Sequence, residues 1–519
     1  MAASATWIGI NVYYFQTYQM DQDEAIHAAR GLDFASAVIR GDYPELWHHL
    51  VKPHWYPPFN GVLLGGWFLM LGVSTFTARL YSTLCYLLLG LLLWASARQL
   101  SPGASPWVFL LPPLFLAADG LYANNSALSM LELPAVLACL AALYSYIHAR
   151  KSGRLLHRTL AWLLAVLALL IKYNYGLVIL AALGLSDLVE IGGKLLRREF
   201  PRAALAMLAA WLPAILIAVI WFVGLKEWQW LNAYADAQPA QYSFWSKANL
   251  LYYPRLLVSQ PVSLLTILLC CSAGLSLIKP PQQARLLIKQ FQQASLLVPY
   301  GVFFAFGLAL LTYVLQDSPR FGMLLFPPLW LGAGVGVEQI LIRLAGWRLR
   351  WGVLALTLLV LSLAGVNNHL ALPSRLNLAY ENSNGGVDEA YHFIAETLQV
   401  ARQAHLRLVM LGNEDQWSGP ALRFYLESQC LFAQAGCEMD VQDGVDLRHG
   451  RPPQKYSKKE QQKRYEKALA EADYLVLFSD KPDSFDQWQL VAEGDFYFKR
   501  RDHPPELHRV VILRPSLSQ

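Results

Sequence analysis

Long runs of apolar residues dominate the first 370 residues of this 519-residue chain. A helix needs roughly 20 mostly apolar residues to cross the hydrocarbon core of a bilayer. Ten segments have this character: 78–98, 104–121, 132–149, 159–173, 174–190, 203–224, 256–278, 295–315, 321–342 and 353–370. A single run of this kind is compatible with a buried helix of a soluble protein. Ten in succession leave no polar faces for a water-exposed surface, so the chain is predicted to be a polytopic α-helical membrane protein.

The composition excludes several other classes of protein. Hydrophobic residues make up 55% of the chain and charged residues 15%, whereas soluble domains carry about 25% charged residues. The 17 Trp, 25 Tyr and 23 Phe residues require burial and exclude a disordered chain. The six cysteines do not follow a metal-binding spacing. No phosphate-binding loop, nucleophile elbow or nucleic-acid motif is present, so we expect no metal, no cofactor and no nucleic-acid partner.

Basic residues collect in alternate loops between the apolar segments. They are Arg98; Arg150, Lys151, Arg154 and Arg158; Lys194, Arg197, Arg198 and Arg202; Lys279, Arg285 and Lys289; and Arg343, Arg348 and Arg350. Positively charged loops stay on the cytoplasmic side of a membrane. The other loops, and everything after residue 370, are therefore predicted to lie outside the cytoplasm.

Two further apolar stretches lie before the first strong segment. Residues 2–18 contain no Lys or Arg, so they resemble neither a signal peptide nor a well-anchored span. Residues 60–74 cover only about 22 Å of helix. If the first residue lies in the cytoplasm, only one of these two stretches can cross the membrane. We favour a crossing at 2–18 and an interfacial helix at 60–74, which gives about 11 transmembrane helices; a truncated start is the alternative.

The composition changes after residue 370. Residues 371–519 are polar, with helix-like stretches at 388–403, 419–429 and 458–471 and β-rich runs at 406–411, 474–478 and 509–513. This alternation predicts a small soluble α/β domain. Its cysteines, Cys430 and Cys437, either form a disulfide in an oxidising compartment or remain two free thiols. The predicted domains are thus 1–370 and 371–519, with an outer loop at 19–77 in the first.

Two acidic positions are candidates for catalysis. Asp23 and Glu24 begin a helix-like stretch in the first outer loop, where His27 and Arg30 follow on the same face as Asp23. An acidic pair at a helix start also serves as a cap or interacts with the helix dipole. Glu132 lies at the outer end of an apolar segment. A carboxylate there is either functional or a surface residue at a helix start.

Two cations are predicted on the same side of the membrane. Lys172 lies between two apolar segments, and Arg320 lies in a short outer loop. Each either holds a phosphate through a charge-assisted hydrogen bond or extends to the lipid headgroups.

Five stretches resemble motifs of one family: MDQDEAIHAARG (20–31), KPHWYPPFNGVLL (52–64), TARLYSTLCYLLLG (77–90), NNSALSMLELPAVLACLAALY (124–144) and SPRFGMLLFPPLWLGAG (318–334). Together, in this order, they resemble the GT-C superfamily of integral membrane glycosyltransferases. The branch most similar to them holds the protein O-mannosyltransferases and the lipid A aminoarabinose transferase, often grouped as family 39-like enzymes. The resemblance covers residues 19–342 and does not include the polar tail.

The resemblance implies transfer of a sugar from a polyprenyl phosphate to a lipid or protein acceptor, with inversion, on the outer face of a membrane. It implies Asp23 as the base, Glu24 as its neighbour and Glu132 as the second loop acid. Donor-phosphate and substrate contacts would come from seven residues: Arg320, Lys172, Lys52, His54, Tyr56, His27 and Arg30. The chain departs from the family in having Glu132 where Asp is frequent and Phe321 where Tyr is common.

Two other functions remain open. A lipid or sugar transporter or flippase would carry ionisable residues near the middle of the bilayer and inverted repeats. A non-catalytic membrane scaffold would bind a partner through its tail. The charges at the ends of the apolar segments favour the enzyme. Its predicted location is the inner membrane of a bacterium, in contact with membrane lipids, with the site outside the cytoplasm.

Overall fold

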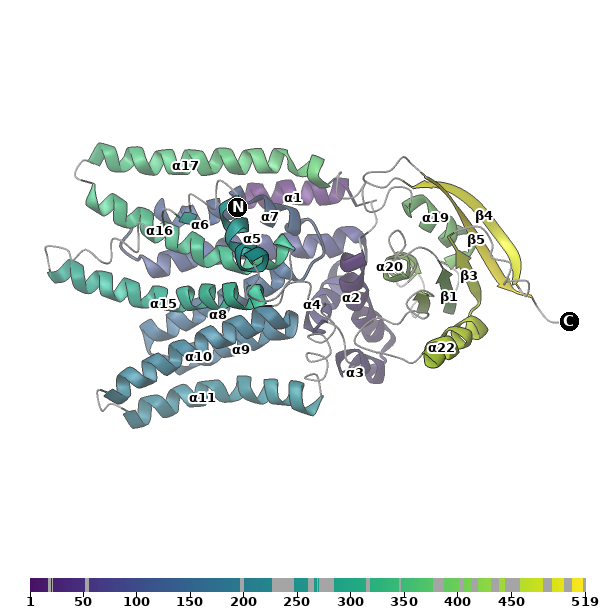
Figure 1. The fold of residues 1–519 in the computed structure, drawn as a ribbon, viewed down its shortest axis with the longest axis horizontal. Coiled ribbons are helices and arrows are strands. Elements are labelled where there is room, and N and C mark those ends of the chain that lie inside the picture. The colour runs from purple at the N-terminus through teal and green to yellow at the C-terminus, as the bar shows by residue number, and fades with distance from the viewer. Residues whose placement is uncertain are drawn as a thin grey trace.

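The computed structural model shows a bundle of long helices with a β-sheet unit at one end (Figure 1). The structure describes residues 1–16, 20, 22–51, 56–196, 200–225, 247–259, 266–267, 269, 284–313, 318–344, 347–376, 387–400, 405–411, 419–430, 438–443, 458–478, 488–498 and 506–516.

The helices of the bundle and of its outer loop are α1 (Ala2–Tyr14), α2 (Gln22–Arg40), α3 (Tyr43–Val51), α4 (Phe59–Leu71), α5 (Thr75–Leu100), η1 (Val108–Leu110), α6 (Leu111–Ala118), α7 (Gly120–Ser126), α8 (Glu132–Ser152), α9 (Leu155–Ile171), α10 (Tyr173–Leu196), α11 (Phe200–Val219), η2 (Ile220–Gly224), α13 (Lys247–Ser259), α15 (Ala284–Tyr313), η3 (Pro319–Leu325), α16 (Phe326–Arg343) and α17 (Trp347–Leu370).

Within the described residues, six helical segments are long and apolar enough to cross a membrane: Thr75–Leu100, Glu132–Ser152, Tyr173–Lys194, Leu205–Gly224, Pro319–Ile342 and Arg348–Leu370. Four shorter apolar helices accompany them: Phe59–Leu71, Val108–Ala118, Leu155–Ile171 and Leu296–Thr312. The chain is therefore an integral membrane protein. The predicted total of about 11 spans stays a prediction, since much of the expected segment 256–278 lies outside the described residues.

The two short N-terminal apolar stretches form α1 and α4. Each has 13 residues, about 20 Å of helix, which is less than a full span. Helix α1 packs along α5 and α17, and the crossing expected at 2–18 stays a prediction. Helix α4 packs mainly against α2, and its predicted position at the membrane interface stays a prediction.

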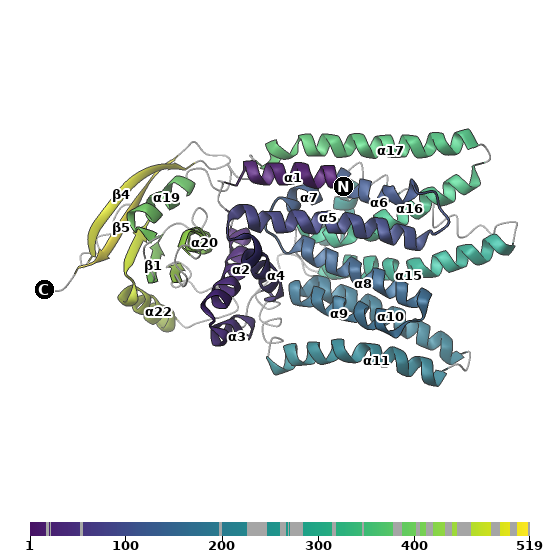
Figure 2. The same cartoon turned by 180° about the vertical axis from the view of Figure 1, so that it is seen from behind.

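Two of the basic loops lie at the same end of the bundle. The α8–α9 and α16–α17 connections both lie at the end opposite to the sheet unit (Figures 1 and 2). Helices α2, α3 and α4 lie at the other end, between the bundle and the sheet. The loops predicted to be cytoplasmic are thus separated from the acidic outer loop by the full length of the bundle.

A buried carboxylate joins four helices in the half of the bundle that carries the basic loops. Asp187 of α10 accepts hydrogen bonds from the Tyr146 hydroxyl (2.7 Å) and from the indole N–H groups of Trp162 (3.1 Å) and Trp211 (2.7 Å). Arg158 lies 3.6 Å away. Because its hydrogen-bonding capacity is occupied by α8, α9 and α11, Asp187 stabilises helix packing.

The described residues of the polar tail form three helices and five strands. They are α19 (Val387–Thr397), β1 (His405–Leu411), α20 (Gly419–Cys430), β2 (Glu438–Asp443), α22 (Lys458–Glu471), β3 (Tyr474–Leu477), β4 (Trp488–Phe498) and β5 (Glu506–Pro515). The strand order is β2-β1-β3-β5-β4, with β2, β1 and β3 parallel and β5 antiparallel to both of its neighbours. We call this part, residues 387–516, the sheet unit. The Cys430 and Cys437 side chains lie outside the described residues.

The strands at 405–411, 474–477 and 506–515 occur where the sequence indicated β structure, whereas β2 and β4 were not expected. Both unexpected strands lie at the edges of the sheet. Strand β4 contains Glu493, Gly494 and Asp495, and β2 contains two Asp and one Glu, residues that are depleted in strands. Their pairing with a neighbouring strand, rather than their own composition, makes them strands.

The sheet unit docks onto the outer loop through α20. Arg423 of α20 lies 2.5 Å from Asp33 of α2, and the Phe424 ring lies 6.1 Å from that of Phe68 in α4. Arg423 also lies 3.3 Å from Glu427, whose Oε1 accepts a 3.1 Å hydrogen bond from the backbone N–H of Met439. These ion pairs and hydrogen bonds around Arg423 therefore join the sheet unit to the loop helices.

Glu427 makes this junction sensitive to pH. Burial raises its pKa to about 7, outweighing the lowering by Arg423. The folded state thus binds the proton more tightly than the unfolded state, whose pKa is near 4.5. The free energy of unfolding should fall by about 3 kcal/mol as the pH rises from 4.5 to 7 and stay level above that. Thermal midpoints of Glu427→Gln between pH 5 and pH 8 should lack this decline, while exposed Glu471→Gln should retain it.

Candidate active site

Four charged side chains of alternating sign meet at the end of the bundle that faces the sheet unit. Arg320 Nη2 pairs with Asp23 Oδ2, and Arg320 Nε lies 3.7 Å from Glu132 Oε1. Lys172 Nζ lies 2.6 Å from the same Glu132 oxygen. These residues come from α2, α8, the α9–α10 junction and η3. We call them the charged cluster.

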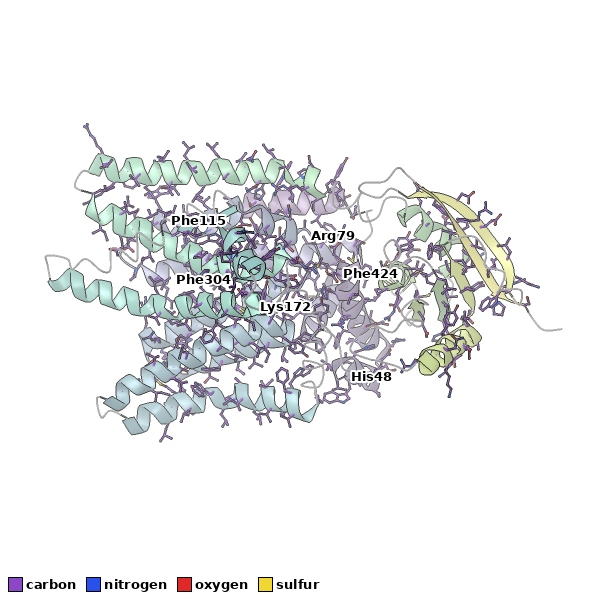
Figure 3. All side chains as sticks on the ribbon, in the orientation of Figure 1. His48, Arg79, Phe115, Lys172, Phe304 and Phe424 are labelled. Atoms are coloured by element: carbon purple, nitrogen blue, oxygen red, sulfur yellow. The ribbon has the colours of Figure 1, made fainter. Side chains whose placement is uncertain are left out.

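The cluster has an exposed side and a buried side. The Asp23 side chain is 35% exposed and that of Arg320 is 25% exposed. Glu132 and Lys172 are almost completely buried behind them. Figure 3 places Lys172 in the half of the bundle nearer the sheet unit. An incoming ligand would therefore meet Asp23 and Arg320 first, with the Glu132–Lys172 pair as a fixed support.

Asp23 and Glu24 both lie in the first turn of α2, but their side chains have different surroundings. Both oxygens of Glu24 face Arg79 of α5, at 3.2 and 3.0 Å, and Oε1 also accepts the backbone N–H of Ser129 at 2.7 Å. Glu24 and Arg79 are fully buried. Glu24 is thus part of a buried bridge that joins α2 to α5 and to the segment before Glu132, and only Asp23 belongs to the charged cluster.

Lys172 is placed by a sharp break between two helices. Helix α9 ends at Ile171, Lys172 has an extended backbone, and α10 begins at Tyr173. Gly176 makes this junction tight, since a Cβ atom there would lie 2.0 Å from the Cα of Leu169. The Lys172 ammonium then lies over the Phe321 ring, 4.4 Å from its centroid.

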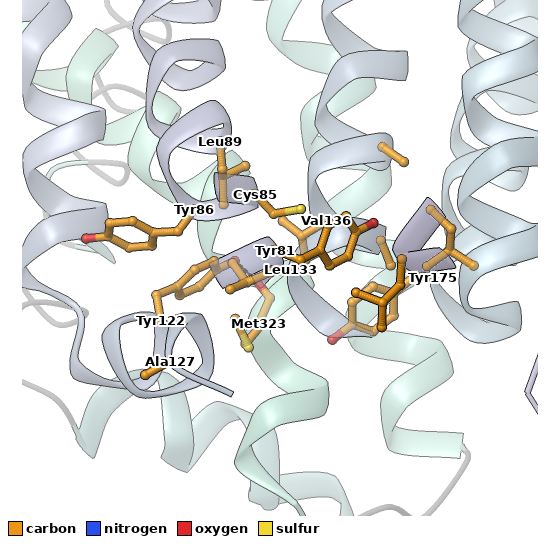
Figure 4. Close-up of a cluster of buried hydrophobic side chains, with 14 of the residues drawn as sticks. Tyr81, Cys85, Tyr86, Leu89, Tyr122, Ala127, Leu133, Val136, Tyr175 and Met323 are labelled. Carbon is orange, nitrogen blue, oxygen red and sulfur yellow. Dashed lines mark hydrogen bonds between the residues drawn. The ribbon is translucent and has the colours of Figure 1, made fainter. Parts of the chain in front are cut away.

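Arg320 is placed by hydrogen bonds to its own backbone. The Tyr175 hydroxyl lies 3.1 Å from the carbonyl oxygen of Arg320 and 3.0 Å from that of Phe321. The Tyr122 hydroxyl donates to the carbonyl of Met323 in the same short helix, η3. Figure 4 shows Tyr122, Tyr175 and Met323 within one cluster of buried side chains. This anchoring limits the movement of η3 and directs the guanidinium toward Asp23.

Three further predicted site residues lie beside the charged cluster. The rings of His27 and Tyr56 meet edge to face, 4.8 Å apart, and Arg30 Nη1 donates a 2.9 Å hydrogen bond to the carbonyl oxygen of Tyr56. Burial, together with Arg30, lowers the pKa of His27 to about 3. His27 is therefore neutral at physiological pH. Lys52 and His54, also predicted, lie outside the described residues.

Two residues that support the cluster were not predicted as site residues. Arg79 lies within the stretch 77–90 that carries the family resemblance but was not singled out there, and neither was Tyr175. A charged residue within an otherwise apolar helix is a recognisable signal, because it requires a partner, and Arg79 has this character. No such signal marks Tyr175, since Tyr is common near membrane interfaces.

The cluster offers two cations beside a partly exposed carboxylate. Arg320 Nε has no hydrogen-bond partner among the described residues, and its Nη1 has a long contact of 3.7 Å with the Met130 sulfur. A guanidinium with donors left over can bind an anion while it holds a carboxylate. In the part of the chain that the structure describes, no three His, Cys, Asp or Glu side chains are grouped to hold a metal ion.

No family model and no curated protein sequence matches the chain. Among solved structures, ArnT from Cupriavidus metallidurans bound to undecaprenyl phosphate has a TM-score of 0.59 and 16% identity, covering 99% of this chain and 96% of that chain. Its apo structure has a TM-score of 0.56 and 14% identity, with 99% and 97% covered. An apo oligosaccharyltransferase from Archaeoglobus fulgidus has a TM-score of 0.49 and 11% identity, with 92% and 69% covered. The likeness to ArnT confirms the resemblance drawn from the sequence motifs at the level of the fold.

Proposed function

We propose that this chain, which has the GT-C fold, is a glycosyltransferase that takes a sugar from a polyprenyl phosphate carrier and passes it to an acceptor. The observation that carries the proposal is the charged cluster: a partly exposed carboxylate, Asp23, next to two fixed cations, Arg320 and Lys172. Transfer from a lipid phosphate needs a base for the acceptor and positive charge for the leaving group. The cluster supplies both.

In the proposed reaction, the acceptor hydroxyl attacks the anomeric carbon while Asp23 accepts its proton. General-base catalysis of this kind contributes about 10² to 10⁴ in rate. The bond from the anomeric carbon to the phosphate oxygen breaks, and the lipid phosphate leaves with the electron pair. Arg320, supported by Lys172, stabilises the negative charge that grows on this phosphate. A single displacement of this type inverts the anomeric configuration.

Lys172 contributes as the buried cation of the cluster. It pairs with Glu132 at 2.6 Å, and Glu132 also lies near Arg320. Glu132 is thus proposed to hold the two cations at a fixed separation rather than to act as a second base. Glu24 is proposed to position α2 through Arg79, because both of its oxygens already accept hydrogen bonds.

The outer face of the membrane is proposed as the side of the reaction. Helix α2, which carries Asp23, lies at the end of the bundle away from the α8–α9 and α16–α17 connections (Figure 1), and Lys172 lies in the half nearer to α2 (Figure 3). Basic loops remain cytoplasmic. The proposed location is the bacterial inner membrane. A transporter would place its unpaired ionisable groups near the middle of the bilayer, whereas Asp187 is saturated by hydrogen bonds from neighbouring helices. This observation favours the transferase.

The donor phosphate gives a direct test. Arg320→Lys keeps the positive charge but loses the fork geometry that matches two phosphate oxygens. We expect its apparent affinity for a short-chain polyprenyl-phosphate sugar, measured at saturating acceptor, to fall by about 10-fold to 100-fold. Arg154→Lys, at an exposed position in the opposite end of the bundle, should leave this affinity unchanged.

If Arg320 only anchors the chain at lipid headgroups, Lys serves equally well. Unchanged donor affinity in both Arg320→Lys and Arg320→Gln would remove Arg320 from the site and leave Lys172 as the candidate cation. Mass spectrometry of glycolipids and glycoproteins from a deletion strain would identify the sugar and the acceptor.

A further inference from the structure

We infer that the sheet unit positions the helix that carries the proposed base, and that Arg423 is the positioning residue. The inference rests on the proposed function in one respect, the role of Asp23. It concerns the opposite part of the same helix, α2, where Asp33 pairs with Arg423 across the junction. The geometry makes this ion pair a second clamp on α2, further along the helix than the Glu24–Arg79 bridge beside Asp23.

Arg423 is itself held firmly within the sheet unit. Its Nε donates a 3.1 Å hydrogen bond to the carbonyl oxygen of Met439 at the edge strand β2, and its Nη2 lies 3.3 Å from Glu427 one turn along α20. The same Nη2 donates to Asp33 at 2.5 Å. With two contacts inside the sheet unit and one outside it, Arg423 transmits the position of α20 to α2.

Helix α2 receives this contact as part of a rigid pair with α4. Gly31 of α2 and Gly65 of α4 lie at a close approach of the two helices. A Cβ atom on Gly65 would lie 2.8 Å from the carbonyl oxygen of Gly31, and one on Gly31 would lie 2.8 Å from the Leu64 side chain. Phe68 of α4 then packs against Phe424, beside Arg423. Helix α20 therefore contacts both members of the pair.

Asp33 and Asp23 are close enough along α2 for a contact at Asp33 to influence the position of Asp23. Ten residues of helix span about 15 Å, and an intact helix transmits a rotation over that length. Arg423 pairs with Asp33, and the His49 Nδ1 atom lies 4.0 Å from an Asp33 carboxylate oxygen. Loss of the Arg423 contact would remove the ionic link between the α2–α4 pair and the sheet unit, while Glu24 and Asp23 still hold the first turn of α2. A displacement of 1 Å at a reacting group costs up to about 10²-fold in rate.

The test compares Arg423→Gln with Asp33→Asn in the full-length protein. We expect both variants to show faster backbone hydrogen exchange in α2, residues 22–40. Turnover should fall by about 10-fold or more, with the dissociation constant for polyprenyl phosphate unchanged. Arg423→Lys keeps the charge and should recover most of the turnover. Arg509→Gln, which removes an exposed arginine paired within the sheet unit, is the matched control and should change neither quantity.

Three outcomes separate the possibilities. Unchanged exchange in α2 and unchanged turnover in both variants would overturn the inference. A parallel loss of turnover and of polyprenyl-phosphate binding in Asp33→Asn, the milder variant, would also overturn it, because general destabilisation would then explain the effect. If the parent protein transfers no sugar but α2 exchanges faster in both variants, the proposed function fails and the positioning of α2 by Arg423 stands.

Discussion

Asp23→Asn should lower sugar transfer by at least about 100-fold while the protein is produced and folded as before. An amide cannot accept the proton of the attacking hydroxyl, and a positioned base contributes about 10² to 10⁴ in rate. The asparagine oxygen can still accept a hydrogen bond from Arg320, so the structure should change little. The measurement is the initial rate of transfer at saturating donor, normalised to folded protein.

Asp23 could alternatively act only as a helix cap. A matched control variant for this alternative is available in the neighbouring loop helix, α3. Asp42 caps α3, where its Oδ1 accepts the backbone N–H of Glu45 at 2.9 Å. Asp42→Asn preserves this oxygen and should leave activity unchanged. If Asp23→Asn behaves like Asp42→Asn, with nearly full turnover, Asp23 is a cap and the base must be sought elsewhere.

Glu24→Gln should have a large effect of a different kind, a loss of folded protein. Arg79 is fully buried, and Glu24 supplies the charge that compensates it. Removing one partner of a buried ion pair costs about 3–5 kcal/mol, a large fraction of the 5–15 kcal/mol that holds a typical protein folded. We expect a lower yield of monodisperse protein in detergent and a lower thermal midpoint.

The double variant Glu24→Leu with Arg79→Met distinguishes this explanation from catalysis by Glu24. Replacing both charges by apolar side chains removes the desolvation penalty, so part of the lost stability should return. A Glu24→Gln protein as stable as the parent but inactive would contradict the structural role. It would instead return Glu24 to the catalytic residues.

Much of the bundle followed from the sequence alone, because its signal is local. Transmembrane helices appear as unbroken apolar runs, and the segments at 78–98, 132–149 and 353–370 correspond to α5, α8 and α17. The strands β1, β3 and β5 were likewise marked by their own β-branched and aliphatic residues. The apolar residues that each of these elements buries are close together in the chain, so a short stretch of sequence was sufficient to predict the element.

The candidate acids and cations were also found in the sequence, since charged residues at the ends of apolar runs are few. The sequence did not show which acid pairs with which cation. The sequence grouped Asp23 with Glu24, whereas the structure directs Asp23 to Arg320 and Glu24 to Arg79, 297 and 55 residues away. Which of two adjacent carboxylates meets which cation depends on the rotation of α2 against α5 and η3, and that rotation is set by helix packing.

Three further features could not be predicted from the sequence for the same reason: the edge strand β2, the edge strand β4, and the contact between Arg423 and Asp33. A strand rich in Asp, Glu and Gly is stabilised by its neighbour in the sheet, and an ion pair between residues 390 positions apart is formed only when the sheet unit docks. The apolar runs in the sequence are sufficient to mark the helices that can enter a bilayer and the charges at their ends. The pairing of those charges required the folded structure, because apolar composition is a local property whereas ion pairs depend on how distant elements pack.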